Sequence, residues 1–305
     1  MALDRGQLGP TPAGGQRARL SLVLVITITL LALEIVGGIV AHSLVLIADA
    51  GHMATDAAGL GLSLLAVWVA RRPASDSRTF GYQRVEILAA VTNAVLLFGV
   101  GAYILVEAAR RLADPQTASP GLIVVFGVLA LVGNGVSLGL LRSGQGTSLN
   151  LRGAFLEVLS DLLGAAAILV AAAVIATTAF QRADAIAAVG IGVLILVRTV
   201  KLLRDAIDVL LEATPKSIDL TEVRGHICDV PGVLDLHDLH AWTITSGIPV
   251  LSAHVVIADA VLASGGGAAV LDRLAECLAG HFDIEHCTFQ LEPASHRDHE
   301  HATHS

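Results

Sequence analysis

The chain has 305 residues, of which 54% are hydrophobic and only 15% are charged, and its mean hydropathy is +0.72. Charged residues make up about a quarter of an ordinary soluble domain, so this composition excludes a typical soluble globular protein and indicates a membrane protein. The formal net charge of -8 argues against a nucleic-acid partner.

Six apolar stretches are long enough to cross a bilayer as helices, because a spanning helix needs about 20 residues. They lie at 20–40, 43–70, 86–109, 120–141, 154–179 and 184–203. An even number of spans places both termini on one side, and the concentration of lysine and arginine on that side predicts that both are cytoplasmic. Residues 1–18 are expected to form a disordered tail, and 19–211 a six-helix transmembrane transport domain.

The last third of the chain mixes polar and apolar residues and predicts a separate domain over 212–293. Its pattern predicts a helix at 220–228, strands at 233–245 and 250–257, a helix at 268–282 and a strand at 287–291. The Ser246-Gly247 pair predicts a hairpin between the first two strands. The αββαβ order predicts an α+β ferredoxin-like cytoplasmic domain, followed by a histidine-rich disordered tail at 294–305.

Two of the predicted spans carry paired ionisable residues. His52 and Asp56 are four residues apart in the second span, and Glu157 and Asp161 repeat that spacing in the fifth. Each pair therefore lies on one helix face, and two such faces together supply the four N and O ligands of a tetrahedral Zn²⁺ site, which Co²⁺ or Cd²⁺ would also suit. An ionisable residue at the bilayer centre costs about 2.5–3.5 kcal/mol on insertion scales, which favours a function for these residues.

The alternative is that these four side chains are hydrogen-bond partners in helix packing, or that they reach out to the membrane interface. If they form one site, its three carboxylates cannot all stay ionised in a low dielectric without a cation. Protons are then expected to compete with the metal, which predicts an exchange of metal for protons. Asp49, one turn before His52, is expected to act as a relay or entry residue, or else as an interfacial helix contact.

Several stretches of the chain resemble the cation diffusion facilitator family, in particular its bacterial zinc, cobalt and cadmium exporters. They are HSLVLIADAGHMATD (42–56), FGYQRVEIL (80–88), LNLRGAFLEVLSD (149–161), LHDLHAWTITSG (236–247), LSAHV (251–255) and HCTFQLE (286–292). The resemblance implies a homodimeric exporter in the bacterial inner membrane that expels zinc, and also cadmium or cobalt, by proton antiport without a prosthetic group. The family's zinc pattern usually has His where Glu157 stands, so a more anionic site with looser selectivity is expected.

The resemblance also implies a cytoplasmic metal site made by His240, His254, His286 and Glu292, shared across a dimer or within one chain. The alternative is that these side chains are solvated or satisfied by other contacts. His226 and His281 are expected to be ordinary domain histidines, and the three scattered cysteines predict neither a disulfide framework nor a CxxC metal pair.

A second function remains open from sequence, that of a membrane-anchored metal-binding sensor in which the helices serve only as an anchor. The four intramembrane ligand residues argue against it, because an anchor has no use for them. An enzyme is not expected, since the sequence contains no nucleophile elbow, P-loop or HExxH motif.

Overall fold

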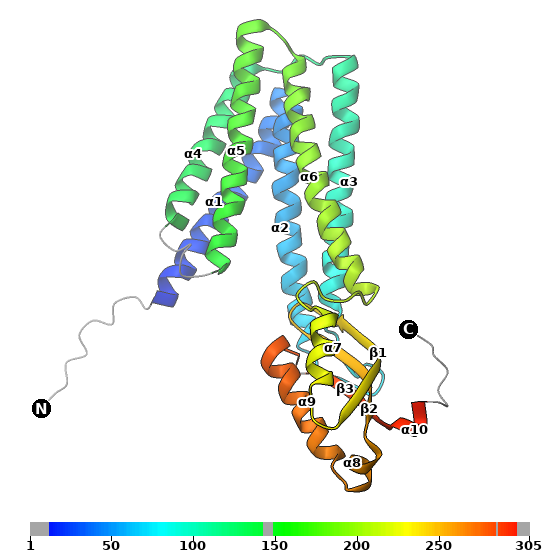
Figure 1. Ribbon diagram of the computed structural model, residues 1–305. Coiled ribbons are helices and arrows are strands. Elements are labelled where there is room, and N and C mark those ends of the chain that lie inside the picture. The colour runs from blue at the N-terminus through cyan, green and yellow to red at the C-terminus, as the bar shows by residue number, and fades with distance from the viewer. Residues whose placement is uncertain (1–11, 143–148, 285, 298–305) are drawn as a thin grey trace, which may run out of the picture. The chain divides into compact units, whose positions relative to one another are not determined.

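The structure is a computed structural model that describes residues 12–142, 149–284 and 286–297 (Figure 1). The chain divides into two compact units. The first consists of the residues up to Gly61 together with Asn93–Lys201, and the second of Leu62–Thr92 together with the residues from Leu202 onward. The predicted tail residues 1–11 and 298–305 lie outside the described residues.

Six long helices follow one another through the first two thirds of the chain. They are α1 (Pro12–Ala41), α2 (Leu44–Ala70), α3 (Val85–Ala113), α4 (Pro120–Arg142), α5 (Leu149–Thr178) and α6 (Arg182–Leu210). Each is long and apolar enough to cross a membrane, and only 22–39% of its most apolar window is buried inside the protein. The remaining apolar surface faces outward, as a surface in contact with hydrocarbon must. The prediction of six spans is confirmed, although α6 continues past its predicted end at residue 203.

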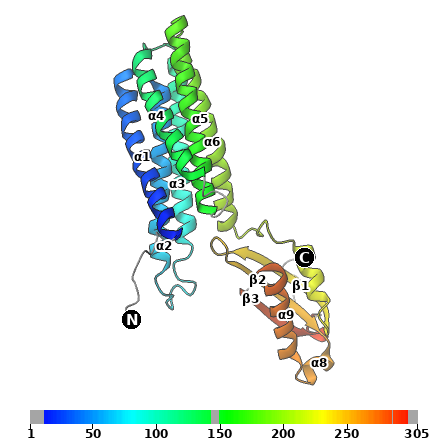
Figure 2. The same cartoon turned by 90° about the vertical axis from the view of Figure 1, so that its left-hand side faces the viewer.

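Small residues bring these helices close together. In Figures 1 and 2, α4 runs beside α1 and α5. A Cβ atom on Gly37 of α1 would lie 2.5 Å from the Phe126 ring of α4, and one on Gly127 of α4 would lie 2.9 Å from Leu169 of α5. Such close approach is how apolar helices gain packing energy in a membrane, where burial from water contributes little.

The first turn of α2 is fixed by a buried carboxylate from α6. Asp184 is 3% exposed and accepts hydrogen bonds from the Leu44 backbone N–H at 2.6 Å and from the Ser43 hydroxyl. The Arg111 Nη1 atom of α3 lies 3.9 Å from the same carboxylate. These contacts satisfy backbone donors that a helix N-terminus leaves free, and they join α2, α3 and α6 at one end.

The C-terminal residues form a three-stranded sheet covered on one face by helices (Figure 2). Strand β1 (Val233–Thr243) pairs antiparallel with β2 (Pro249–Ile257), which pairs parallel with β3 (His286–Pro293). The core forms between alternate residues of β2 and the inner faces of α7 (Leu220–Cys228) and α9 (Gly267–Phe282). Two short helices, α8 (Asp259–Ala263) and α10 (Ala294–Arg297), complete the domain. The predicted αββαβ order is confirmed, although α10 occupies the start of the predicted tail.

The turn between β1 and β2 and an irregularity within β1 shape the sheet. Gly247 has φ of 76°, which an L side chain rarely adopts, in the predicted turn between β1 and β2. Farther back in β1, His237 pairs with His254 while His240 pairs with Ser252, so β1 contains one extra residue there. The extra residue lets His237 and His240 lie on the same face of the sheet, the face opposite α7 and α9.

Candidate functional site

The membrane unit brings the two predicted ligand pairs into one region. The His52 Nε2 atom lies 3.4 Å from the Asp56 Oδ2 atom on α2. On α5, Glu157 is close enough to Asp56 to interact with it electrostatically, and Asp161 is buried with 5% of its surface exposed. Asp56, Glu157 and Asp161 line one cavity of about 520 Å³, which also has residues of α1 in its wall. His52 adjoins this group through its contact with Asp56.

The four residues are near one another without forming a single coordination sphere. Within the described ranges, groups of three or more His, Cys, Asp or Glu donors within 4.8 Å of one another occur at two places, both outside the membrane helices. The Nδ1 atom of His52 is buried and makes no hydrogen bond to the described residues. For all four residues to hold one metal ion, their donor atoms would therefore have to lie closer together than they do here. His52 would supply one of its two ring nitrogens to such an ion.

Two charged residues near this site were not predicted from the sequence. Arg198 on α6 places its Nη1 atom 3.8 Å from the Asp56 Oδ2 atom. Glu34 on α1 is 1% exposed and interacts electrostatically with Asp49 and Asp161. Glu34 could have been found by the same signal as the others, since it is an acidic residue within an otherwise apolar span.

Asp49 and Glu34 are two buried carboxylates that interact electrostatically near the predicted metal ligands. Asp49 is 2% exposed, and neither carboxylate oxygen of Glu34 makes a hydrogen bond of ordinary geometry to the described residues. Gly164 of α5 allows this arrangement, because a Cβ atom at that position would lie 2.8 Å from the Asp49 Oδ1 atom. These two carboxylates are not among the described residues that line the cavity, but Glu34 interacts electrostatically with Asp161, which does line it.

The C-terminal domain contains a compact cluster on the face of its sheet opposite α7 and α9. The Glu292 carboxylate is 2% exposed and contacts a histidine with each oxygen, His254 Nδ1 at 2.8 Å and His237 Nε2 at 3.1 Å. The centroids of the two imidazole rings are 5.1 Å apart. Gln290 donates a further hydrogen bond to Glu292 at 2.8 Å. Two nitrogens and a carboxylate at this spacing are a donor set suited to a divalent cation.

This cluster contains two of the four predicted cytoplasmic residues, His254 and Glu292, and adds His237. His240 lies farther along β1, opposite Ser252, and is exposed. His286 points elsewhere, toward Phe80, with ring centroids 5.6 Å apart. His237 is selected over His240 because it lies directly opposite His254 in the register, which residue spacing alone does not reveal.

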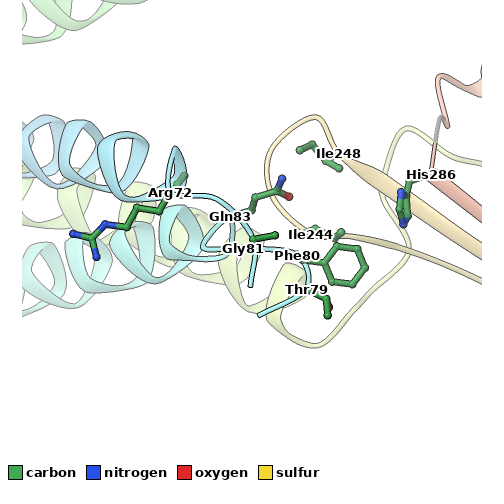
Figure 3. A pocket seen from close by; sticks show the side chains of 10 residues that line it. Arg72, Thr79, Phe80, Gly81, Gln83, Ile244, Ile248 and His286 are labelled. Carbon is green, nitrogen blue, oxygen red and sulfur yellow. The ribbon is translucent and has the colours of Figure 1, made fainter. Parts of the chain in front are cut away.

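Phe80 and His286 line a second cavity, of about 250 Å³, shown in Figure 3. The other side chains around it include Arg72, Gln83, Ile244 and Ile248. Among the described residues of this lining, His286 alone has a side chain that commonly binds metals, so the cavity does not supply a metal site.

The three cysteines, Cys228, Cys277 and Cys287, are free thiols. Burial raises the pKa of each thiol above its usual value, so all three are neutral at physiological pH unless a metal displaces the proton.

Comparison with known proteins matches both parts of the chain to one family. Residues 20–211 match the cation efflux transmembrane domain, and residues 215–294 match the cytoplasmic domain of cation efflux proteins. The metal cation efflux system protein CzcD of Cupriavidus metallidurans is 48% identical, over 92% of this chain and 88% of its own length.

Two further relatives have similar coverage. A cadmium, cobalt and zinc/H(+)-K(+) antiporter of Bacillus velezensis is 38% identical, over 93% of this chain and 91% of its own. The zinc transporter ZitB of Escherichia coli is 36% identical, over 92% of this chain and 89% of its own. With six membrane-capable helices and both family domains in place, the chain is not an enzyme: it is a multi-pass membrane protein that belongs to the cation efflux family.

Proposed function

We propose that this protein exports divalent metal cations from the bacterial cytoplasm across the inner membrane in exchange for protons. Zinc is the proposed main substrate, and cadmium and cobalt are further substrates. The observation that carries the proposal is the cavity of about 520 Å³ lined by Asp56, Glu157 and Asp161, with His52 beside it. The names of the relatives, which include a metal efflux protein, a zinc transporter and a metal/proton antiporter, support the same substrate class.

The donor chemistry favours zinc-type ions. One imidazole nitrogen and three carboxylate oxygens suit Zn²⁺, Cd²⁺ and Co²⁺, whereas a soft monovalent ion would prefer a thiolate, which these four residues do not offer. Glu157 adds a negative charge where the zinc pattern of the family has His. We therefore propose a broader metal range for this protein than for a site with two histidines.

Proton exchange follows from the crowding of the carboxylates. Glu34 and Asp49 join Asp161 in a buried acidic group, and one nearby cation, Arg198, contacts Asp56 at 3.8 Å. Several carboxylates in such surroundings cannot all be ionised, so the group holds protons when metal is not bound. Entry of a divalent cation releases those protons. These protons are released toward the cytoplasm, the side from which the metal enters. Glu34 and Asp49 are proposed to bring new protons to the group from the outer face, since α2 begins at Leu44 near that face if both termini are cytoplasmic.

The protein is proposed to act as a homodimer in which the cytoplasmic domain binds the same ions at His237, His254 and Glu292. A membrane-anchored sensor is not favoured, because the buried carboxylates of α1, α2 and α5 would then destabilise the membrane unit without serving a purpose. The remaining partners are the lipid bilayer and protons, and no nucleic acid is proposed.

The proposal is tested with purified protein in liposomes that contain a zinc indicator and a pH indicator. Wild-type protein is expected to move Zn²⁺ and protons in opposite directions. Asp161→Asn is expected to abolish both fluxes, whereas Asp208→Asn, which changes a carboxylate whose side chain is 50% exposed, is expected to retain them. Zinc movement through the Asp161→Asn variant would refute the site, and zinc movement without a proton flux would refute the exchange.

The same liposomes test the metal range. Glu157→His is expected to narrow transport toward Zn²⁺, with Cd²⁺ and Co²⁺ reduced relative to wild type. Unchanged ratios among the three ions would mean that residue 157 does not set the selectivity.

A further inference from the structure

A second group of metal-ligand side chains lies on the helical side of the cytoplasmic domain. His226 is on α7, while Cys277 and His281 are one turn apart on α9. The inner faces of the same helices, through Ile227, Leu274 and Leu278, pack into the domain core. The group is thus separated by the sheet from the His237, His254 and Glu292 cluster, and none of its members belongs to the proposed transport site.

The spacing of the three side chains matches that of metal ligands. The Cys277 Sγ atom lies 3.7 Å from the His226 Nδ1 atom, and one donor atom from each of the three residues lies within 4.8 Å of the others. In a tetrahedral zinc site, with Zn–S of about 2.3 Å and Zn–N of about 2.0–2.1 Å, neighbouring donors are about 3.5 Å apart. The three donor atoms are thus close to that spacing, and the exposed His281 side chain has room to approach the other two.

The imidazole of His281 is already oriented by the backbone. Its Nδ1 atom lies 3.0 Å from the Cys277 carbonyl oxygen, so Nδ1–H is the donor and Nε2 keeps a free lone pair. Metal-binding histidines are commonly held in this way, with the second nitrogen donating to a carbonyl. The ring centroids of His226 and His281 are 4.7 Å apart, and the centroid of the Phe282 ring lies 5.1 Å from that of His226.

The local charge also favours a cation. Asp229, which follows α7, is close enough to Cys277 to interact with it electrostatically. Together with a thiolate, this carboxylate would place two negative charges near a bound divalent ion, and a water molecule could complete the coordination. Aromatic packing between the helices would explain the ring contacts, but it would not require a thiol within 3.7 Å of an imidazole nitrogen.

We propose that His226, Cys277 and His281 form a cytoplasmic site for a thiophilic divalent cation such as Zn²⁺, Cd²⁺ or Co²⁺. A bound ion links α7 to α9 and so stabilises the helical layer of the domain. The proposal is independent of transport, because the site shares no residue with the membrane cavity.

The test uses Co²⁺ as a probe on the full-length protein in detergent. A cobalt–thiolate bond gives a strong near-ultraviolet charge-transfer absorption, and the two other proposed metal sites offer only nitrogen and oxygen donors. We expect this absorption in the wild type and in the control variants Cys228→Ser and Cys287→Ser. It should be absent from Cys277→Ser, and absent or greatly weakened in His226→Phe, which keeps an aromatic ring against Phe282.

Thermal unfolding without added metal checks that each variant is folded. Absence of the band from the wild type at saturating Co²⁺ would overturn the proposal. So would a band of full strength in Cys277→Ser, which would assign the thiolate to another cysteine, or in His226→Phe, which would reduce the site to a single thiol.

Discussion

The close approach of Gly164 to Asp49 makes a sharp prediction about α2 and α5. Alanine at position 164 would place its Cβ atom 2.8 Å from the Asp49 Oδ1 atom, whereas ordinary contacts begin at 3.4 Å. Asp49 has a short side chain and is 2% exposed, so it has little room to move. In Gly164→Ala, either α5 shifts away from α2 or the Asp49 carboxylate rotates away from Glu34.

The loss of stability expected for Gly164→Ala is measured against a matched control variant in the same membrane unit. A Cβ atom on Gly139 of α4 would have no described neighbour within 4 Å, so Gly139→Ala adds a methyl group in open space. Both variants gain roughly 0.5–1 kcal/mol in helix propensity, and this gain cancels in the comparison. Overpacking costs roughly 1–3 kcal/mol, so Gly164→Ala should be less stable than Gly139→Ala by about that amount.

The assay is reversible unfolding of both variants in mixed micelles, followed by the liposome flux measurement. Gly164→Ala is expected to unfold more easily and to exchange zinc for protons more slowly, while Gly139→Ala behaves as wild type or is slightly more stable. If the two variants had equal stability and equal flux, the contact between α2 and α5 and its proposed role in proton movement would both be wrong.

Three further predictions concern residues away from that contact. Asp184→Asn should lower the free energy of unfolding by about 1–3 kcal/mol, measured in mixed micelles, because a buried charged acceptor for Ser43 is lost. Asp219→Ala should lower the unfolding midpoint of the cytoplasmic domain at neutral pH. The backbone N–H of Thr221 holds the pKa of Asp219 below its usual value, so the difference from wild type should vanish as pH falls below about 4. Glu292→Gln should weaken Zn²⁺ binding by the cytoplasmic domain in calorimetry while leaving the cobalt–thiolate absorption unchanged.

Hydropathy predicts the membrane helices well because the requirement that they must meet can be read directly along the sequence. A helix in hydrocarbon needs a continuous run of apolar residues, and that run can be counted in the sequence. The ends are less well predicted. α6 continues to Leu210 because nothing in the sequence between residue 203 and that point breaks a helix, and leaving the hydrocarbon does not end one.

The ligand pairs of α2 and α5 were predictable from helical spacing, since residues four apart share a face. The contact of Arg198 with Asp56 could not be predicted in this way, because it depends on which face of α6 lies toward α2. The same limit applies to the second cytoplasmic group. His226 is separated from Cys277 by most of the domain sequence, and only the packing of α7 on α9 brings them within 3.7 Å.

The extra residue in β1 has a consequence for how related sequences are aligned. Before it, Leu236 faces the helices, and after it Ala241 does, so the inward positions change from even to odd numbers. Deleting Asp238, whose φ is 46°, would make the spacing between His237 and His240 equal to that between their partners His254 and Ser252, so both halves of the strand would keep their faces. Deleting a residue where the pairing is already regular would instead turn one half of the strand over, and either a histidine would enter the core or an apolar residue would enter water. In an alignment of related sequences, a one-residue gap at the extra residue therefore preserves the side-chain orientations, whereas the same gap a few positions away would exchange metal ligands for core residues.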